Sequence, residues 1–279
     1  MNKCLHYASV TKKVTLAIIG GFLMIFLLLH AGINLCLLRD DGGEWYRAAC
    51  HFMGTNVIIK VFEYVLFAAF ILHILLAIVL QIQNWRARGP VGYKIPNKSA
   101  TRPGSKYMIY TGILVLIFLG IHMMNFYFVK KGWVEGRYLV ELSSIDKVDP
   151  AVLEQNQMQI VSLFQAQDGD ASNAYGIKSV ADDLTKDELA LFGDGFTAYE
   201  PDFYNMAITL FSNTAYVLIY LILIVALAIH LRHAFGSAFQ TLGWNHPKYT
   251  PFVEGFGLFY AALIGVMFGI VPIWFLLIY

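Results

Sequence analysis

The chain has 279 residues, of which 58% are hydrophobic and only 14% are charged, and its formal net charge is +1. About a quarter of the residues in soluble domains are charged, so this composition excludes an ordinary soluble protein. We also expect no nucleic-acid partner. The hydrophobic residues gather in five runs: 14–36, 57–82, 107–129, 206–231 and 252–279. Because about 20 helical residues cross the ~30 Å hydrocarbon core of a bilayer, each run predicts a transmembrane helix in an all-α membrane protein.

The distribution of basic residues predicts the orientation of these helices. The connection 84–106 carries six Lys or Arg residues and no acid, and the N-terminal segment adds Lys3, Lys12 and Lys13. The positive-inside rule therefore predicts a cytoplasmic N-terminus, with segments 39–56 and 130–205 outside. Five crossings then leave the C-terminus outside.

The chain divides into three predicted regions: 1–129 with three transmembrane helices, an extracytoplasmic insert at 130–205, and 206–279 with two more helices. Residues 130–202 contain fourteen acids and six basic residues. Asp149 followed by Pro150 predicts the start of a helix over 151–164. Thr185 and Glu188 form a capping box that predicts a second, shorter helix. We expect a small, partly helical outer cap; an irregular acidic loop is the alternative.

Four histidines lie inside the first four hydrophobic runs, one in each: His30, His73, His122 and His230. An ionisable side chain within the bilayer costs several kcal/mol by most estimates, so it usually marks a functional site. His30 lies 16 positions after residue 14, and His122 lies 15 after residue 107. His73 lies 16 positions after residue 57, and His230 lies 18 after Ser212, where we expect the hydrocarbon to begin.

Because successive helices run in opposite directions, these depths predict two pairs. His30 and His122 would lie toward the outer side, and His73 and His230 toward the inner side. The two levels would differ by roughly 15–20 Å along the membrane normal. That spacing accommodates two flat macrocycles stacked within a four-helix bundle, and neutral imidazole suits haem iron. The pattern therefore predicts two bis-histidine haem sites.

Other roles for these histidines are less consistent with the pattern. Core histidines bonded to the backbone are common singly but not in matched pairs. A proton relay would need carboxylates, and Glu63 is the one acid in the four runs. A zinc or di-iron site would bring its ligands to one level, often with a Glu-x-x-His motif. Small residues near the histidines, including Gly20 and Gly112, would let helices pass a porphyrin, or would equally serve close helix packing.

Several further residues are weaker candidates. Arg232 and His233 would contact a haem propionate or a partner subunit, since guanidinium binds carboxylates in a bidentate manner. His51, before the second helix, is a candidate for hydrogen bonding to a quinone headgroup; an ordinary interfacial histidine is the alternative. Cys36 and Cys50 would both lie near the outer face, where they would either pair or remain as free thiols.

Long stretches of the chain resemble a known family, the two-haem cytochrome b anchors of succinate:quinone oxidoreductases and quinol:fumarate reductases (complex II). The resembling stretches cover about three quarters of the chain and read KKVTLAIIGGFLMIFLLLHAGIN, AACHFM, AAFILHILLAI, KYMIYTGILVLIFLGIHMMNF and SNTAYVLIYLILIVALAIHLRHAFGSAFQTLGWNHPKYTP. In that family one histidine from each of the first four helices ligates haem. Those positions correspond to His30, His73, His122 and His230.

The resemblance implies more than the residues alone. It implies a multi-pass protein of the bacterial inner (cytoplasmic) membrane that docks an iron–sulfur subunit and a flavoprotein subunit on the cytoplasmic side, the latter carrying FAD. Electrons would pass between these subunits and a membrane quinone near the outer haem, and the quinone in many two-haem members is menaquinone. The chain alone would not act on succinate or fumarate, although it would contribute to the quinone site. A dimer of the whole complex is compatible with the resemblance.

Two departures from the family pattern and two alternative functions stay open. The insert at 130–205 is longer than the usual connection, and Ala228 stands where some quinol:fumarate reductases carry a proton-conducting glutamate. One alternative is the cytochrome b anchor of a formate dehydrogenase or hydrogenase, or a transmembrane reductase. Several of those place two histidines about 14 residues apart on one helix, a spacing absent from every run here. The other alternative is a haem-free transporter or interaction protein.

Overall fold

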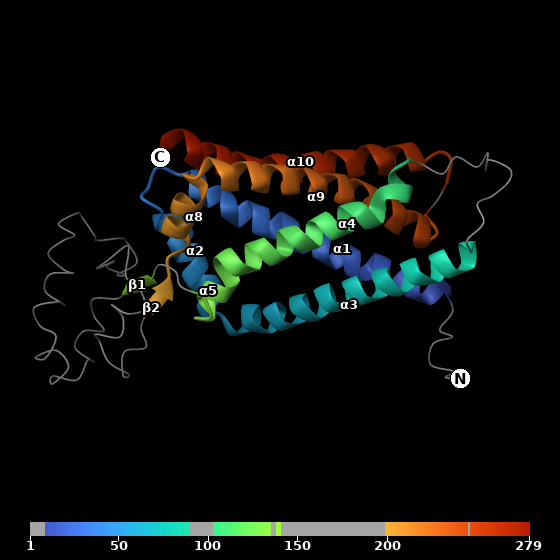
Figure 1. Cartoon of the computed structure of the whole chain (residues 1–279), viewed down its shortest axis with the longest axis horizontal. Helices are drawn as coiled ribbons and strands as arrows, with labels where there is room; N and C mark the ends of the chain where they lie inside the picture. The colour runs from blue at the N-terminus through green and yellow to red at the C-terminus, as the bar shows by residue number, and fades with distance from the viewer. Residues whose placement is uncertain (1–8, 90–102, 135–137, 141–198, 245) are drawn as a thin grey trace, which may run out of the picture. The chain divides into compact units, whose positions relative to one another are not determined.

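The computed structural model describes residues 9–89, 103–134, 138–140, 199–244 and 246–279 (Figure 1). Apart from one short antiparallel pair of strands and the turns between elements, these residues are helical. The elements in chain order are α1 (Ser9–Asn34), η2 (Leu35–Leu38), α2 (Glu44–Thr55), α3 (Val57–Arg88), α4 (Pro103–His122), η3 (Met123–Tyr127), α5 (Phe128–Lys130), β1 (Tyr138–Val140), β2 (Tyr199–Pro201), α8 (Phe203–Phe211), α9 (Thr214–Thr241) and α10 (Thr250–Ile278).

Five segments of the described chain are long and apolar enough to cross a membrane, as the sequence predicted. They are Val10–Leu38, Val57–Ala87, Tyr107–Lys130, Thr214–Thr241 and Thr250–Ile278. Together they indicate a multi-pass membrane protein.

The start of the fourth spanning helix differs from the expected range. Residues 206–211 belong to the separate short helix α8, which ends at Phe211. Asn213 then begins α9, because its side-chain oxygen accepts a hydrogen bond from the backbone N–H of Ala215 at 2.9 Å. The long apolar run therefore consists of two helices, and the second begins close to Ser212, the position used in the depth estimate.

The ends of α3 have clear local causes. Asn56 precedes the helix, and its side-chain oxygen accepts hydrogen bonds from the backbone N–H groups of Ile58 and Ile59. This cap separates α3 from α2, although the two helices are adjacent in sequence. At the other end, Gly89 has φ of 69°, a conformation that glycine adopts without steric cost, and its N–H bonds to the carbonyl of Trp85.

The chain forms two compact units. The first comprises Met1–Asn34, Asn56–Phe118 and Ile219–Ile270, and the second comprises Leu35–Thr55, Leu119–Leu218 and Val271–Tyr279. The first unit therefore holds α1 and α3 with most of α4, α9 and α10. His30, His73 and His230 fall in the first unit, and His122 falls in the second.

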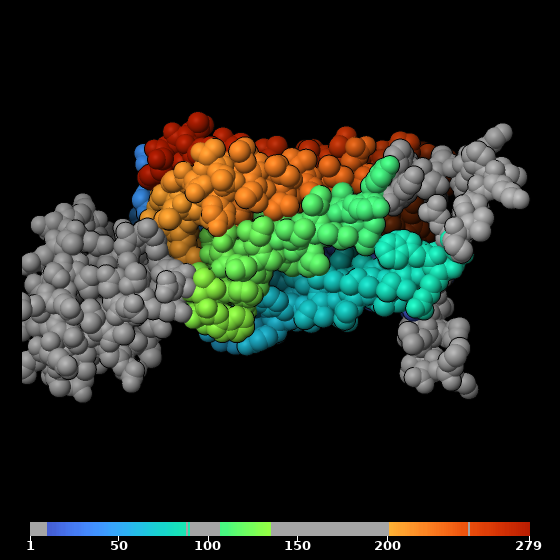
Figure 2. Space-filling view, viewed as in Figure 1, coloured from blue at the N-terminus to red at the C-terminus, as the bar shows by residue number. Residues whose placement is uncertain are grey.

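The core of the first unit joins α1, α9 and α10. Its buried residues come from these three helices, and the hydroxyl of Tyr260 donates a hydrogen bond to the carbonyl of Met24 at 2.5 Å. Figure 1 shows α9 and α10 side by side, and the spanning segments of both are far more buried than those of α3 and α4. The side chains of α3 (teal) and α4 (green) form much of the face in Figure 2. Lipid would cover this apolar surface in a membrane.

The second unit is held together by an ion pair between α2 and the start of α8. Arg47 donates from Nε to Asp202 Oδ1 at 3.2 Å and from Nη2 to Oδ2 at 3.0 Å. Asp202 is fully buried, and it also caps α8 by accepting from the backbone N–H of Asn205. The buried carboxylate thus has partners from two helices.

Two strands in the second unit pair where the predicted insert leaves and returns. β1 and β2 are antiparallel, with Tyr138 opposite Pro201, Leu139 opposite Glu200 and Val140 opposite Tyr199. The strand pair was not predicted from the sequence. The helices expected at 151–164 and after Thr185 lie outside the described residues.

Candidate cofactor site at the intramembrane histidines

The structure brings together His73 on α3 and His230 on α9, the two histidines expected at the inner level. Both lie in the first unit, close enough for their rings to interact electrostatically. Both side chains are partly buried. Two imidazoles from different helices are the protein donors that a bis-histidine haem requires.

One edge of the His230 ring faces α4. Its Nδ1 lies 3.2 Å from the hydroxyl oxygen of Thr111, and that hydroxyl donates to the carbonyl of Met108 at 3.0 Å. A Cβ atom added to Gly112 would lie 3.5 Å from His230 Cε1, an ordinary van der Waals contact. Within the described residues no hydrogen bond reaches His230 Nε2. The ring is therefore held on one side, and its second nitrogen remains open to a ligand.

His73 has a different environment. Its Nδ1 is buried and has no hydrogen-bond partner in the described part of the chain. A buried polar atom left in this way costs about 1–3 kcal/mol, so it calls for a partner that the described residues do not supply. Gly20 of α1 faces the ring, because an added Cβ there would lie 3.7 Å from His73 Cε1.

These features fit a bound haem at the inner pair. Each histidine has a glycine of a neighbouring helix beside its Cε1. Little side-chain volume therefore lies next to either ring. His73 has a buried nitrogen to which no described residue bonds, and His230 has one nitrogen already engaged by α4. The donor set and its surroundings are therefore compatible with axial ligation.

His30 lies at the end of α1 among aromatic rings. It stacks on Phe26, with ring centroids 5.4 Å apart, and lies 5.7 Å from the ring of Phe268. The side-chain amide nitrogen of Asn34 lies 3.4 Å from His30 Nε2. Because an amide nitrogen only donates, Nε2 accepts and carries the lone pair that a metal would use. This bond is long, and a ligand at Nε2 would replace it.

His122 is the last residue of α4 and directly precedes the π-helical turn η3. Its ring lies 5.1 Å from that of Phe126, which lies 6.4 Å from the ring of Phe203. Single π turns inside α-helices occur frequently at functional sites. Because His30 and His122 fall in different units, their pairing stays a prediction.

The weaker candidates are dispersed. Arg232 is exposed and makes no hydrogen bond or ion pair with the described residues, while His233 is half-buried on the same helix. His51 lies on α2 in the second unit, and its carbonyl accepts from Thr55. No described residue shows how these side chains would meet a propionate or a quinone, so their roles stay predictions.

Cys36 and Cys50 are not joined in a disulfide, and both lie near the buried phenol of Tyr46. Burial raises the pKa of Tyr46 well above its ordinary value, and the nearby Cys50 raises it further. Burial also raises the pKa of Tyr204, and a hydrogen bond with Tyr279 adds to this effect. Both phenols are therefore neutral at physiological pH.

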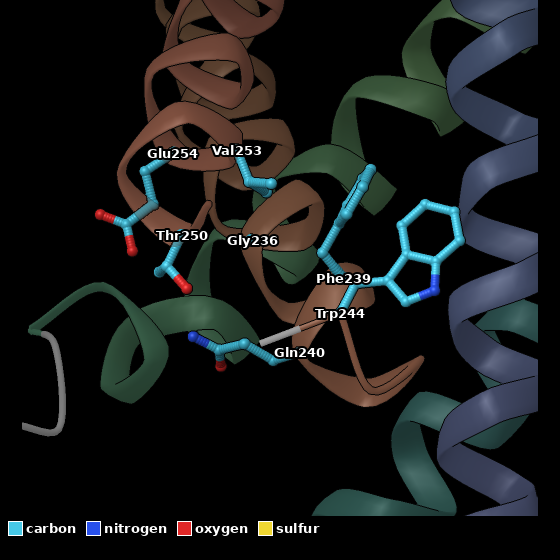
Figure 3. Close-up of a pocket in the computed structure, with 7 residues that line it drawn as sticks. All are labelled: Gly236, Phe239, Gln240, Trp244, Thr250, Val253 and Glu254. Atoms are coloured by element: carbon cyan, nitrogen blue, oxygen red, sulfur yellow. The ribbon is translucent and has the colours of Figure 1, made fainter. Parts of the chain in front are cut away.

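A shallow pocket of about 220 Å³ opens at one end of α9 and α10 (Figure 3). Gln240, Thr250 and Glu254 give it a polar side, and Phe239 and Trp244 an aromatic side. The pocket contains none of the predicted site residues.

Across the described ranges, no group of three or more His, Cys, Asp or Glu side chains could hold a metal ion. A bis-histidine haem needs only two protein ligands.

Sequence reasoning missed Thr111, the π turn after His122 and the ion pair between Arg47 and Asp202. The ion pair joins residues 155 positions apart, which no local sequence pattern predicts.

Comparison with models of known protein families, with curated proteins and with solved structures found no match.

Proposed function

We propose that this chain is the two-haem cytochrome b subunit that anchors a succinate:quinone oxidoreductase or quinol:fumarate reductase in the bacterial inner (cytoplasmic) membrane. The observation that carries the proposal is the approach of His73 and His230 within one unit, with a buried nitrogen on His73 that no described residue partners. Depth counting selects the same two residues, and so does the family resemblance. The basic connection 84–106 supports a cytoplasmic N-terminus.

In this function the chain's residues hold and insulate two haems b. His73 and His230 would hold the inner haem, and His30 and His122 the outer haem. Haem iron, when bound, accepts and releases one electron at a time. Apolar side chains of the spanning helices exclude water around these positions, which contributes to the reduction potential. Exposed Arg232 provides a cation for a propionate or for a partner subunit.

Electrons would be exchanged with an iron–sulfur subunit and an FAD-carrying flavoprotein on the cytoplasmic side, and with a quinone, menaquinone in our proposal, near the outer haem. His51 is the candidate for hydrogen bonding to the quinone.

The insert at 130–205 would cap this quinone site. Deleting residues 146–194 should then change quinone affinity, and unchanged quinol kinetics in an assembled complex would contradict this role.

Haem counting tests the proposal. The purified complex should show two haems b per chain in reduced-minus-oxidised spectra. Replacing His73 or His230 with alanine should remove one of them and leave the other. His246→Ala is the matched control, because His246 is exposed and lies on the same side of the protein in our orientation. It should keep both haems.

Three results would contradict the proposal. Fewer than two haems in the wild-type complex would exclude a two-haem anchor, and a colourless protein would favour a transporter or interaction protein. Loss of the outer haem alone in His73→Ala would contradict the pairing. Co-purification with a molybdenum or nickel subunit, in place of a flavoprotein and an iron–sulfur subunit, would identify the anchor of a formate dehydrogenase or hydrogenase.

A further inference from the structure

The hydrogen bonds around Thr111 determine which nitrogen of His230 carries a hydrogen. The Thr111 hydroxyl donates to the Met108 carbonyl at 3.0 Å, one helical turn earlier on α4. Its oxygen lies 3.2 Å from His230 Nδ1. A hydroxyl has one hydrogen and two lone pairs. With that hydrogen bonded to Met108, the oxygen offers the ring a lone pair, and we assign the donor role to Nδ1.

The backbone of α4 fits the same arrangement. Gly112, the residue after Thr111, leaves room for the ring to lie against the helix, with 3.5 Å between an added Cβ and Cε1. Thr111 and Gly112 therefore lie against one edge of His230. With the hydrogen on Nδ1, the lone pair is on Nε2.

We propose that Thr111 is a positioning residue, which fixes the tautomer and orientation of His230 so that Nε2 presents its lone pair to the iron of the inner haem. This inference rests on the proposed function. A metal-ligating histidine usually donates its other N–H to such a partner, which raises the basicity of the ligand. His73 has no comparable partner in the described part of the chain. Among the described residues, this hydrogen-bond support is therefore found for His230 and not for His73.

The test compares three variants of the whole complex. Thr111→Val has nearly the same shape and removes the hydroxyl, whereas Thr111→Ser retains it. Thr209→Val is the matched control, because Thr209 is also helical and donates to a backbone carbonyl, that of Asn205 at 2.9 Å, but it is exposed. The readouts are haem content per chain, the reduction potential of each haem and the electron paramagnetic resonance signal of the ferric inner haem. The signal lost in His73→Ala identifies the inner haem.

In Thr111→Val we expect the affinity for the inner haem to fall about 10-fold or more. Where the inner haem is retained, a less basic ligand favours the reduced state. A tenfold increase in the equilibrium constant for its reduction would raise the one-electron potential by about 59 mV. Its ferric resonance signal should also shift. Thr111→Ser and Thr209→Val should match the wild type, and the outer haem should be unaffected in all three.

The outcomes separate this inference from the proposed function. A wild-type complex with fewer than two haems would overturn both. A wild-type complex with two haems, together with Thr111→Val of unchanged inner-haem content, potential and resonance signal, would overturn the role of Thr111 alone. Failure of Thr111→Ser to restore the wild-type values would also overturn it, since the hydroxyl would then not be the determining group.

Discussion

Removing the carboxylate of Asp202 should strongly destabilise the second unit. Asp202 is fully buried, and the side chain of Arg47 is only 14% exposed. Asp202→Ala would remove both charge-assisted hydrogen bonds of Arg47 and the cap of α8. The guanidinium would then be left almost fully buried without its counter-ion. Breaking a buried pair in this way costs roughly 3–5 kcal/mol.

Hydrogen exchange of the backbone amides of α8 and α2 would measure this loss. Since about 1.4 kcal/mol corresponds to a factor of ten, the expected loss accelerates exchange in these helices by roughly 10²–10⁴-fold where exchange follows opening of the unit. Amides in the core of the first unit, such as those near Leu227, provide the internal reference.

Two controls make this measurement specific. Arg39→Ala breaks the ion pair with Asp41, also 3.0 Å long, but the Arg39 side chain is 53% exposed, so the loss should be at most about 1 kcal/mol. The double variant Arg47→Met with Asp202→Leu replaces the pair by apolar groups and should recover much of the lost stability. If Asp202→Ala accelerates exchange no more than Arg39→Ala does, the buried pair does not hold this unit together.

Three further predictions follow from the described contacts. Gly112→Leu should displace the His230 ring and abolish the absorbance of the inner haem. Gly112→Ala should retain this absorbance, because the added Cβ would be in ordinary contact with the ring at 3.5 Å. Equal spectra for the two variants would contradict the close approach of Gly112 and His230. Tyr46 and Tyr204 have raised pKa values in the folded protein, so their contribution to stability should be present below about pH 10 and lost as the pH rises above it. Ultraviolet titration checks this, because the double Phe variant should leave the absorbance change near pH 10 unaltered. Cys36→Ser with Cys50→Ser should lower the number of thiols titrated in unreduced, denatured protein by two, and an unchanged number would indicate a disulfide.

The spanning helices were predictable because their signal is local. A run of about 20 apolar residues has one stable arrangement in a bilayer, so composition alone located the five segments. The most displaced boundary, at Phe211, resulted from a cap at Asn213 inside an otherwise apolar run. Hydropathy does not reveal such a cap, because one polar residue hardly changes the mean hydropathy of a run of about 20 residues.

The candidate site was predictable only in part. Depth counting selected His73 and His230 because a buried ionisable residue is rare enough to stand out in the sequence. Thr111 did not stand out, because threonine is common in helices and its role depends on which ring lies against it. The partner of Asp202 was equally hidden, since Arg47 lies 155 positions earlier in the chain. Contacts of this kind depend on how helices meet, which residue types alone do not specify.

The pairing of β1 with β2 has a consequence for how this chain can change in length. Tyr138 and Pro201 lie opposite one another, so the two ends of the segment between the strands are held side by side. Doubling the length of a flexible loop between fixed ends costs only about 0.6 kcal/mol. The strand pair therefore serves as an attachment point at which a reporter domain or an affinity tag could replace the intervening residues, with the route of the chain into α8 preserved.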